Sequence, residues 1–240
     1  NWSGHFILSV FKSILPAFLA EKILLLTYFI GLPYAFRSLV TQVNAKNILA
    51  SYLIFPFLYS YPFMLGFYNF SLALGFMLLA LSYWLKHQED IYSSNKAKVV
   101  MFVLFMLTYF SHLIVFAVLL LILGIYVVFD FIQKFTIDNT DAKSLFKNAG
   151  KKTLALLITS ALPFILFSNY FMKRSATGSE IYIEPSTLIK ALFDLRPLIV
   201  YNMSFEKQYT QIIFFVLLFL ALAVLVKKVL YFFKKQKVIK

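Results

Sequence analysis

The chain has 240 residues and no cysteine, which excludes disulfides, thiolate metal sites and a cysteine nucleophile. Charge is also scarce: charged residues make up 14% of the sequence, against about 25% in soluble domains, and only 10 residues are acidic. The sequence lacks a Walker A lysine, a glycine-rich nucleotide turn, and the HExxH, GxSxG and paired-carboxylate patterns. We therefore expect no chemistry that depends on a cytosolic nucleotide.

Apolar residues dominate what remains. They make up 61% of the chain, against about 45–50% in soluble domains, and phenylalanine alone occupies 29 positions. A soluble fold of this length leaves too much surface exposed to hide so many apolar side chains. The apolar residues lie in long uncharged runs, and helices are the natural way to satisfy backbone polar groups in lipid. The sequence therefore predicts an all-α, polytopic transmembrane helical bundle, with residues 1–240 forming a single transmembrane domain.

The apolar runs predict about seven spans plus short interfacial helices. One straight helix over 48–85 would be about 57 Å long, too long for a bilayer, and Pro56, Pro62 and Gly66 indicate a chain reversal inside it. The run 99–132 is expected to break at the polar pair Ser111–His112. The predicted spans are Ala20–Leu39, 48–59, Asn69–Leu85, 99–111, 112–132, Thr153–Phe171 and Tyr209–Val226.

The segments between these runs have their own signatures. Residues 4–19 are too short to span and carry Lys12 and Pro16, so we expect an amphipathic interfacial helix. Residues 134–152 are interpreted as a polar loop with five lysines. Residues 186–195 are expected to form a second interfacial helix, with Leu188, Leu192 and Leu195 on one face.

The net charge of +13 is explained by lysines at the ends of apolar runs, so we expect membrane lipids as partners and no nucleic acid. In the seven-span topology, 37–47, 86–98, 134–152 and the C-terminal tail carry 16 lysines and arginines, and the opposite side carries 7. The positive-inside bias places the first group in the cytoplasm. A rival topology, with 48–85 as one span and the N-terminus inside, gives the same two counts.

Candidate site residues converge on the predicted outer face. Ionisable or polar residues near membrane depth are functional candidates, although helix-end hydrogen bonds, ion pairs and aromatic belts are the plainer explanations. The basic residues between 172 and 208 run against the positive-inside bias, and both lipid headgroups and a dedicated phosphate ligand fit them. The candidates for substrate binding are His5, Glu21, Lys22, Tyr61, Tyr68, Asn69, His112, Arg174, Lys190 and Arg196. No metal site is expected, since two histidines without a placed carboxylate are a weak signal, and no cofactor can be named.

The opening segment carries a family resemblance. Gly4-His5-Phe6-Ile7-Leu8 to Leu15-Pro16, then Phe18-Leu19-Ala20-Glu21-Lys22-Ile23-Leu24 and a span ending at Arg37, is similar to the segment after the first outer loop of GT-C type membrane glycosyltransferases. The Phe-Tyr-Asn turn, the Ser-His break and the polar outer loop before a late span are similar too.

This resemblance implies an inverting enzyme that uses a polyprenyl-phosphate-linked sugar at the outer face of the membrane. In that family the catalytic acidic residue lies in the first outer loop, which would fall before Asn1. We therefore expect a fragment that lacks its N-terminal portion, whose catalytic residues stay unknown and whose own activity is in doubt. We expect it in a plasma membrane, the inner membrane of a bacterium.

Two other classes of function stay open. A transporter or flippase subunit predicts internal repeats and broken helices around a site in the middle of the membrane. The sequence shows no clear repeat between its halves and no charged residue near the middle of a span. A non-catalytic membrane scaffold is compatible with every feature described so far.

Overall fold

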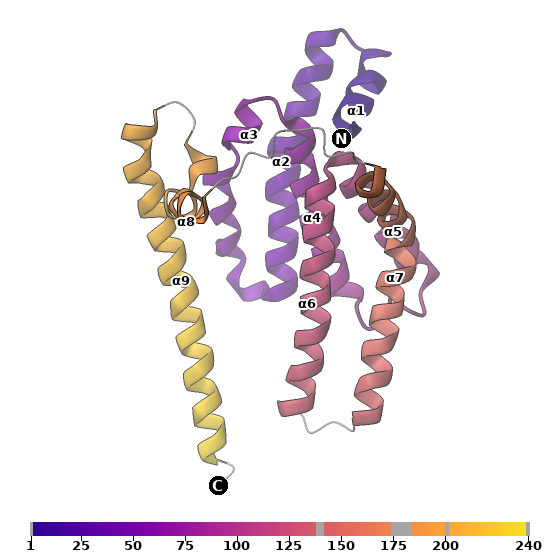
Figure 1. Cartoon of the computed structure of the whole chain (residues 1–240), viewed down its shortest axis with the longest axis vertical. Helices are drawn as coiled ribbons and strands as arrows, with labels where there is room; N and C mark the ends of the chain where they lie inside the picture. The colour runs from indigo at the N-terminus through magenta and orange to yellow at the C-terminus, as the bar shows by residue number, and fades with distance from the viewer. Residues whose placement is uncertain (1, 138–141, 174–183, 200–201, 239–240) are drawn as a thin grey trace. The chain divides into compact units, whose positions relative to one another are not determined.

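The structure is a computed structural model, which describes the chain except residues 1, 138–141, 174–183, 200–201 and 239–240. The described residues are helical and include no strand, so the all-α prediction is confirmed (Figure 1). The elements are α1 (Ser3–Lys12), α2 (Ala17–Val43), the 3-10 helix η1 (Ala45–Phe57), α3 (Tyr61–Met64), α4 (Tyr68–His87), α5 (Asn95–Ser111), α6 (Leu113–Ile137), α7 (Ala142–Lys173), α8 (Pro185–Phe193), the 3-10 helix η2 (Arg196–Leu198) and α9 (Met203–Val238).

Five helices among the described residues are long and apolar enough to cross a membrane, so the chain is a membrane protein. They cover Ala17–Val43, Tyr68–His87, Leu113–Phe135, Lys143–Lys173 and Met203–Ala223. The predicted number of about seven spans is not confirmed. The two remaining predicted spans coincide with η1 and α5, which have only 13 and 17 residues.

The chain forms two compact units. Unit 1 comprises Asn1–Leu58 and Gly66–Thr177, and unit 2 comprises Tyr59–Leu65 and Gly178–Lys240. In unit 1, α4 packs against α2, α5 and α6, and α7 packs against α5 and α6 (Figure 1). The centre of unit 1 is filled by large, fully buried side chains from these helices, among them Trp84, Met101, Phe105, Phe116 and Leu119.

Hydrogen bonds define two ends of unit 1. At the Asn69 end, the Gly4 amide donates to Asn69 Oδ1 at 2.6 Å and the hydroxyls of Ser3 and Ser111 lie 2.6 Å apart. At the Glu89 end, Lys152 contacts Glu89 and Asp130. The chain therefore runs from the Asn69 end along α4, returns along α5, runs again along α6 and returns along α7. This alternation agrees with the predicted order of the four corresponding segments.

The predicted breaks in the two long apolar runs are present. Gly66 has φ +79°, a left-handed conformation that glycine adopts without steric cost, and it separates α3 from α4. His112 alone is extended, with φ −158° and ψ 118°, and it separates α5 from α6. No continuous helix therefore connects 48 with 85, or 99 with 132, and both expected interruptions are confirmed.

Three expected boundaries are wrong. The interfacial segment 4–19 is not one helix, because α1 ends at Lys12 and Pro16 caps a new helix, α2. The segment 134–152 is mostly helical rather than a loop, since α6 continues to Ile137 and α7 begins at Ala142. The last helix begins at Met203, not Tyr209.

A reciprocal cap explains the early start of α9. Asn202 Oδ1 accepts from the amides of Ser204 and Phe205 at 3.1 and 3.3 Å, and Glu206 Oε1 accepts from the Asn202 amide at 2.8 Å. Such a cap satisfies amides that the first turn of a helix leaves unpaired.

Candidate functional site

The turn that joins α8 to α9 in unit 2 is anchored by a buried carboxylate. The side chain of Asp194 is 3% exposed; Gln211 donates to its Oδ1 at 2.7 Å, and Lys207 lies 3.5 Å from the same atom. The Thr210 hydroxyl donates to the Asp194 carbonyl at 2.6 Å. A buried carboxylate needs such partners, because an unpaired charge is costly away from water. Asp194 therefore holds the turn against the first turns of α9.

The next residue, Leu195, is the only non-glycine residue with positive φ in the described part of the chain, at φ 44° and ψ 50°. A left-handed conformation costs an ordinary side chain about 1–2 kcal/mol. Residues held in such conformations occur at functional sites when the surrounding structure enforces them. The anchoring of Asp194 supplies that enforcement, and the turn it creates presents Arg196.

Arg196 lies over an aromatic ring and makes no ion pair with any residue that the structure describes. Its guanidinium lies 6.0 Å from the ring centroid of Tyr61, and its Nη1 donates to the sulfur of Met203 at 2.8 Å. No carboxylate among the described residues forms an ion pair with it, whereas the neighbouring Lys207 is paired with Asp194. The structure thus brings together Tyr61 and Arg196, two predicted site residues separated by more than half of the chain. A stacked, exposed guanidinium with free N–H groups can bind an oxyanion through two parallel hydrogen bonds.

The other basic candidates around Arg196 differ in what the structure describes. Lys190 lies on α8, is exposed, and has no side-chain partner among the described residues. Arg174 lies outside the described residues. The predicted interfacial helix at 186–195 is present as α8, with Leu188, Ile189 and Leu192 more than half exposed. Leu195, expected on the same apolar face, instead lies beyond the helix end in the left-handed turn.

Three other candidates lie at the Asn69 end of unit 1. Asn69 accepts the Gly4 amide, and a Cβ at Gly4 would lie 2.6 Å from Asn69 Oδ1, so this close approach requires glycine. Tyr68 is the first residue of α4 and is half-buried. The ring of His112 meets Phe70 edge-on at 5.1 Å, and its buried Nδ1 has no hydrogen-bond partner among the described residues. The plainer explanation for His112, a helix-end histidine that donates a hydrogen bond to a backbone carbonyl, is therefore wrong for its Nδ1 among the described residues.

His5, Glu21 and Lys22 are exposed and are not gathered into a site. The Lys22 ammonium lies 5.7 Å from the ring centroid of Phe18, one turn earlier on α2. An ion pair between Glu21 and Lys22, the alternative to a substrate-facing role for these residues, is not among the ion pairs of the described residues. In the described part of the chain, no group of three or more His, Cys, Asp or Glu side chains is placed to hold a metal.

The sequence analysis missed a charged cluster at the Glu89 end. The side chain of Lys152 is 3% exposed, and its Nζ lies 2.8 Å from Glu89 Oε1, 2.9 Å from Asp130 Oδ2 and 3.2 Å from Gln88 Oε1. Lys134 lies 3.3 Å from Glu89 and 3.2 Å from Asp130. The cluster joins the turn after α4 to α6 and α7. One signal was available: Asp130 and Lys134 stand four residues apart, the spacing of a helical ion pair.

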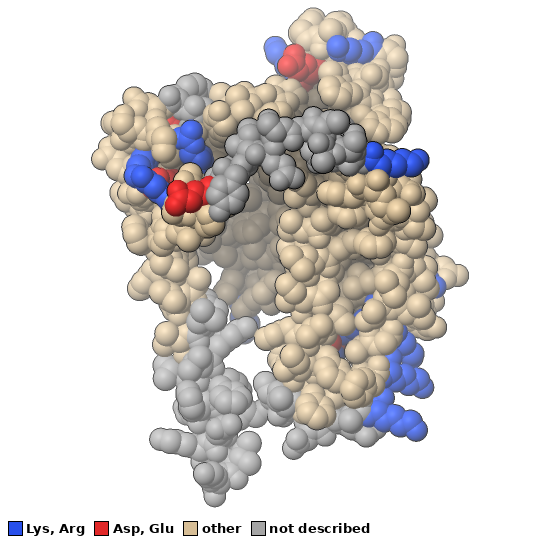
Figure 2. All heavy atoms as spheres, viewed as in Figure 1, with Lys and Arg blue, Asp and Glu red and all other residues tan. Residues whose placement is uncertain are grey.

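Blue spheres gather over the lower end of α7 in Figure 2, on the side of unit 1 that the charge count assigns to the cytoplasm. There, Lys143, Lys147 and Lys151 are exposed and four residues apart. Lys152, which follows directly, is the buried member of the charged cluster. The sequence alone does not distinguish the solvated lysines from the paired one.

The electrostatics of the cluster predict a pH dependence. Burial alone raises the pKa of the Glu89 carboxyl, but the hydrogen bond from Lys152 and the charges of Lys152 and Lys134 outweigh it, so the pKa lies below its ordinary value of 4.5. A lowered pKa means that Glu89 stabilises the fold fully above pH 4.5 and loses this contribution as the pH falls through the folded-state value. We expect Glu89→Gln to reduce the loss of thermal stability between about pH 5 and pH 3.

Glu21→Gln is the matched control, because Glu21 is exposed and makes no ion pair among the described residues. It should leave the slope of melting temperature against pH as it is in the unsubstituted protein. Equal slopes for Glu89→Gln and the unsubstituted protein would contradict the assignment of Glu89.

Comparisons with protein-family models, with curated proteins and with solved structures found no match for this chain. The features that bear on function are therefore the geometry around Arg196 and the five helices that are long and apolar enough to cross a membrane.

Proposed function

We propose that the chain is part of a membrane glycosyltransferase that takes a sugar from a lipid-phosphate donor, and that Arg196 binds the donor phosphate. The observation that carries the proposal is the exposed guanidinium held between Tyr61 and Met203 with no carboxylate partner among the described residues. A sugar transferred from a lipid phosphate leaves charge on that phosphate, and a preorganised arginine stabilises such charge in the transition state.

The surroundings of Arg196 suit a lipid-linked donor. The adjacent helix α8 exposes Leu188, Ile189 and Leu192, as interfacial helices do when they lie between headgroups and acyl chains. Lys190 on the same helix offers a second cation at that depth, and the ring of Tyr61 offers an aromatic face to a sugar. We assign this region to the outer face of the membrane, because the opposite loops carry the larger share of lysine and arginine.

The acid–base chemistry of transfer needs a carboxylate that is free to accept a proton. Asp194 does not serve, because it is buried and bonded to Lys207 and Gln211.

A transporter is the weaker candidate. It requires polar groups near the middle of the membrane, whereas the buried ion pairs of unit 1 in the described residues lie at the Glu89 end.

The test is donor binding. We expect Arg196→Ala to weaken binding of a polyprenyl phosphate in nanodiscs by roughly ten- to a hundredfold, the effect of losing charge-assisted hydrogen bonds worth about 1.5–3 kcal/mol. Arg196→Lys should weaken it less, since a lysine keeps the charge but loses the planar fork. Lys46→Ala, an exposed lysine of unit 1, is the control and should bind as the unsubstituted protein does.

Unchanged binding in Arg196→Ala, with the melting temperature intact, would show that Arg196 only contacts ordinary headgroups. Weakened binding without any transfer from a polyprenyl-phosphate sugar by the longest natural form of the protein would support a lipid-phosphate site but contradict a glycosyltransferase.

A further inference from the structure

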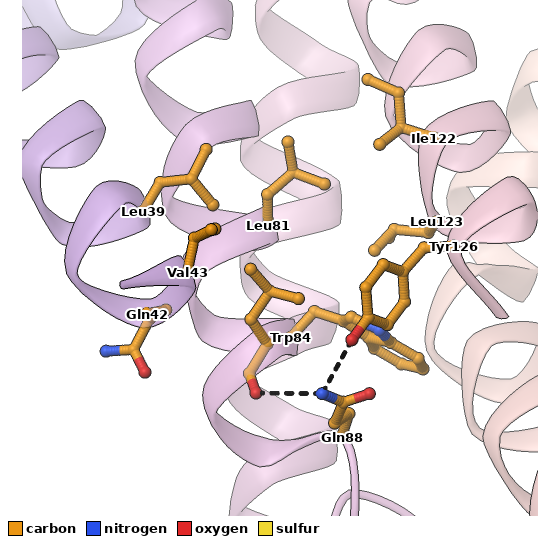
Figure 3. Close-up of a pocket in the computed structure, with 10 residues that line it drawn as sticks. Leu39, Gln42, Val43, Leu81, Trp84, Gln88, Ile122, Leu123 and Tyr126 are labelled. Carbon is orange, nitrogen blue, oxygen red and sulfur yellow. Dashed lines mark hydrogen bonds between the residues drawn. The ribbon is translucent and has the colours of Figure 1, made fainter. Parts of the chain in front are cut away.

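A crevice of about 460 Å³ opens between α2, α4 and α6 at the Glu89 end of unit 1 (Figure 3). Its volume lies within the range of about 300–1,000 Å³ typical of small-molecule sites. Helix α4 contacts both α2 and α6 and forms the floor between them. The walls are mostly aliphatic, with a few polar side chains: Leu39, Gln42, Val43, Leu81, Trp84, Leu85, Gln88, Ile122, Leu123 and Tyr126. The crevice is open to the surroundings of the protein, so molecules from those surroundings can enter it.

The crevice extends from the helix ends toward the interior of the membrane. Val43 is the last residue of α2, and Gln88 is the C-cap of α4. Leu81 lies seven residues before Gln88, which is about 10 Å along the helix axis at about 1.5 Å per residue. The polar residues Gln42, Gln88 and Tyr126 therefore lie near one end, and aliphatic residues line the deeper part. The lining matches an amphipathic molecule with an apolar body and a polar head.

A chain of hydrogen bonds defines what the polar head must offer. Lys152 Nζ donates to Gln88 Oε1 at 3.2 Å, and Gln88 Nε2 donates to the Tyr126 hydroxyl oxygen at 3.0 Å (Figure 3). Because that oxygen accepts a hydrogen bond, its own proton is left to donate, and no acceptor for it exists among the described residues. Hydrogen bonds in such a chain polarise one another, and this chain begins at a buried ammonium, so the Tyr126 hydroxyl is a strengthened donor. An acceptor oxygen attached to hydrocarbon would complete this chain of hydrogen bonds.

We propose that this crevice binds one glycerophospholipid of the bilayer, with an acyl chain between α2 and α6 and an ester carbonyl oxygen accepting the Tyr126 proton. The surrounding solvent supplies this occupant, since five helices of the chain are long and apolar enough to cross a membrane. The site lies in unit 1 and is separate from the residues assigned to the phosphate donor. Lys152 is a positioning residue, because it reaches the crevice only through Gln88, whereas Gln88 both lines the crevice and orients the Tyr126 hydroxyl.

The crevice contains its own reporter. The chain has two tryptophans, and Trp84 lines the crevice with its side chain fully buried. Trp2→Phe leaves Trp84 as the single tryptophan. In bilayers of a phosphatidylcholine with bromines on its acyl chain, which quench tryptophan at short range, we expect strong quenching of Trp84. Leu81→Phe with Ile122→Phe places two larger rings across the crevice, from α4 and α6, and should exclude an acyl chain from it. Only quenching by lipid at the protein perimeter should then remain.

Two comparisons make the test decisive. Ile125→Phe makes the same change as Ile122→Phe on α6, but at an exposed position outside the crevice, and it should be quenched as the Trp2→Phe protein is. Tyr126→Phe removes only the hydroxyl. When the brominated ester lipid is diluted with an unbrominated ether-linked phospholipid, which lacks the ester carbonyl, the fraction of brominated lipid needed for half-maximal quenching should rise roughly two- to tenfold, the effect of one hydrogen bond.

Equal quenching in the Trp2→Phe protein with and without Leu81→Phe and Ile122→Phe would overturn the proposal, because only perimeter lipid would then reach Trp84. A brominated alkane of the same chain length, which has no headgroup, tests the ester contact without any crevice variant. If the alkane quenches as effectively as the phospholipid, and Tyr126→Phe changes nothing, the crevice takes hydrocarbon without an anchored head and the proposed ligand is wrong.

Discussion

Replacing Lys152 with alanine is expected to lower the free energy of unfolding by about 3 kcal/mol. Removing one partner of a buried ion pair costs about 3–5 kcal/mol, because the remaining charge stays desolvated and unpaired. Asp130, with its side chain 20% exposed, would lose its buried partner, whereas Glu89 is 61% exposed and can be solvated by water. Lys134 still contacts both carboxylates, which places the expected loss at the lower end of that range.

The control for this prediction is the adjacent residue. Lys151 is exposed, and its ammonium lies 5.9 Å from the ring centroid of Tyr92, so Lys151→Ala should change stability by no more than about 0.5 kcal/mol. Equilibrium unfolding of the purified protein in mixed micelles measures both variants. Similar small losses for Lys151→Ala and Lys152→Ala would show that the cluster at the Glu89 end is solvated rather than buried.

Lys152 also illustrates a limit of sequence reasoning. Five lysines between 134 and 152 indicate a solvated loop, and that reading placed the start of the helix at Thr153. Tertiary structure overrides it, because Leu145 packs into unit 1 and the partners of Lys152 come from α4's C-terminal turn and from α6. Charge can be counted from the sequence, but its neutralisation by residues 22 and 63 positions away cannot.

Local backbone signals were more informative. Gly66 and the Ser111–His112 pair marked interruptions that the structure contains, since both depend on the chemistry of single residues rather than on packing. The cap of α9 was equally local, because Asn202 and Glu206 stand four residues apart, yet it was overlooked. Local chemistry therefore gave the helices and most of their ends, whereas the number of membrane crossings depended on how η1 and α5 were counted.

The candidate site divides in the same way. Residue type and expected side of the membrane singled out Tyr61 and Arg196 separately, but their stacking requires α3 and η2 to meet in unit 2. In the sequence, Lys207 and Arg196 belong to the same basic segment, 172–208. The structure distinguishes the two cations. The buried carboxylate of Asp194 pairs with Lys207, whereas the Arg196 guanidinium has no acidic partner among the described residues.

The second large expected effect concerns packing among α5, α6 and α7. Phe116 is fully buried, and its ring lies 6.0 Å from Phe105, 5.7 Å from Tyr109 and 6.4 Å from Phe167, measured between centroids. Phe→Ala in a water-soluble core costs about 3–5 kcal/mol, which includes transfer of the ring to water. Lipid chains are as apolar as this core, so the transfer contribution falls away and the cavity and ring contacts remain. We therefore expect Phe116→Ala to cost about 2 kcal/mol.

Phe129, on the same helix, is 56% exposed and is the control, since its ring faces lipid in the folded and unfolded protein alike. Phe129→Ala should cost less than about 0.5 kcal/mol when unfolding is measured in the same micelles. A loss of about 4–5 kcal/mol for Phe116→Ala would be the full value for a soluble core. It would mean that Phe116 enters water when the protein unfolds, which contradicts a bundle whose helices stay in lipid when they separate.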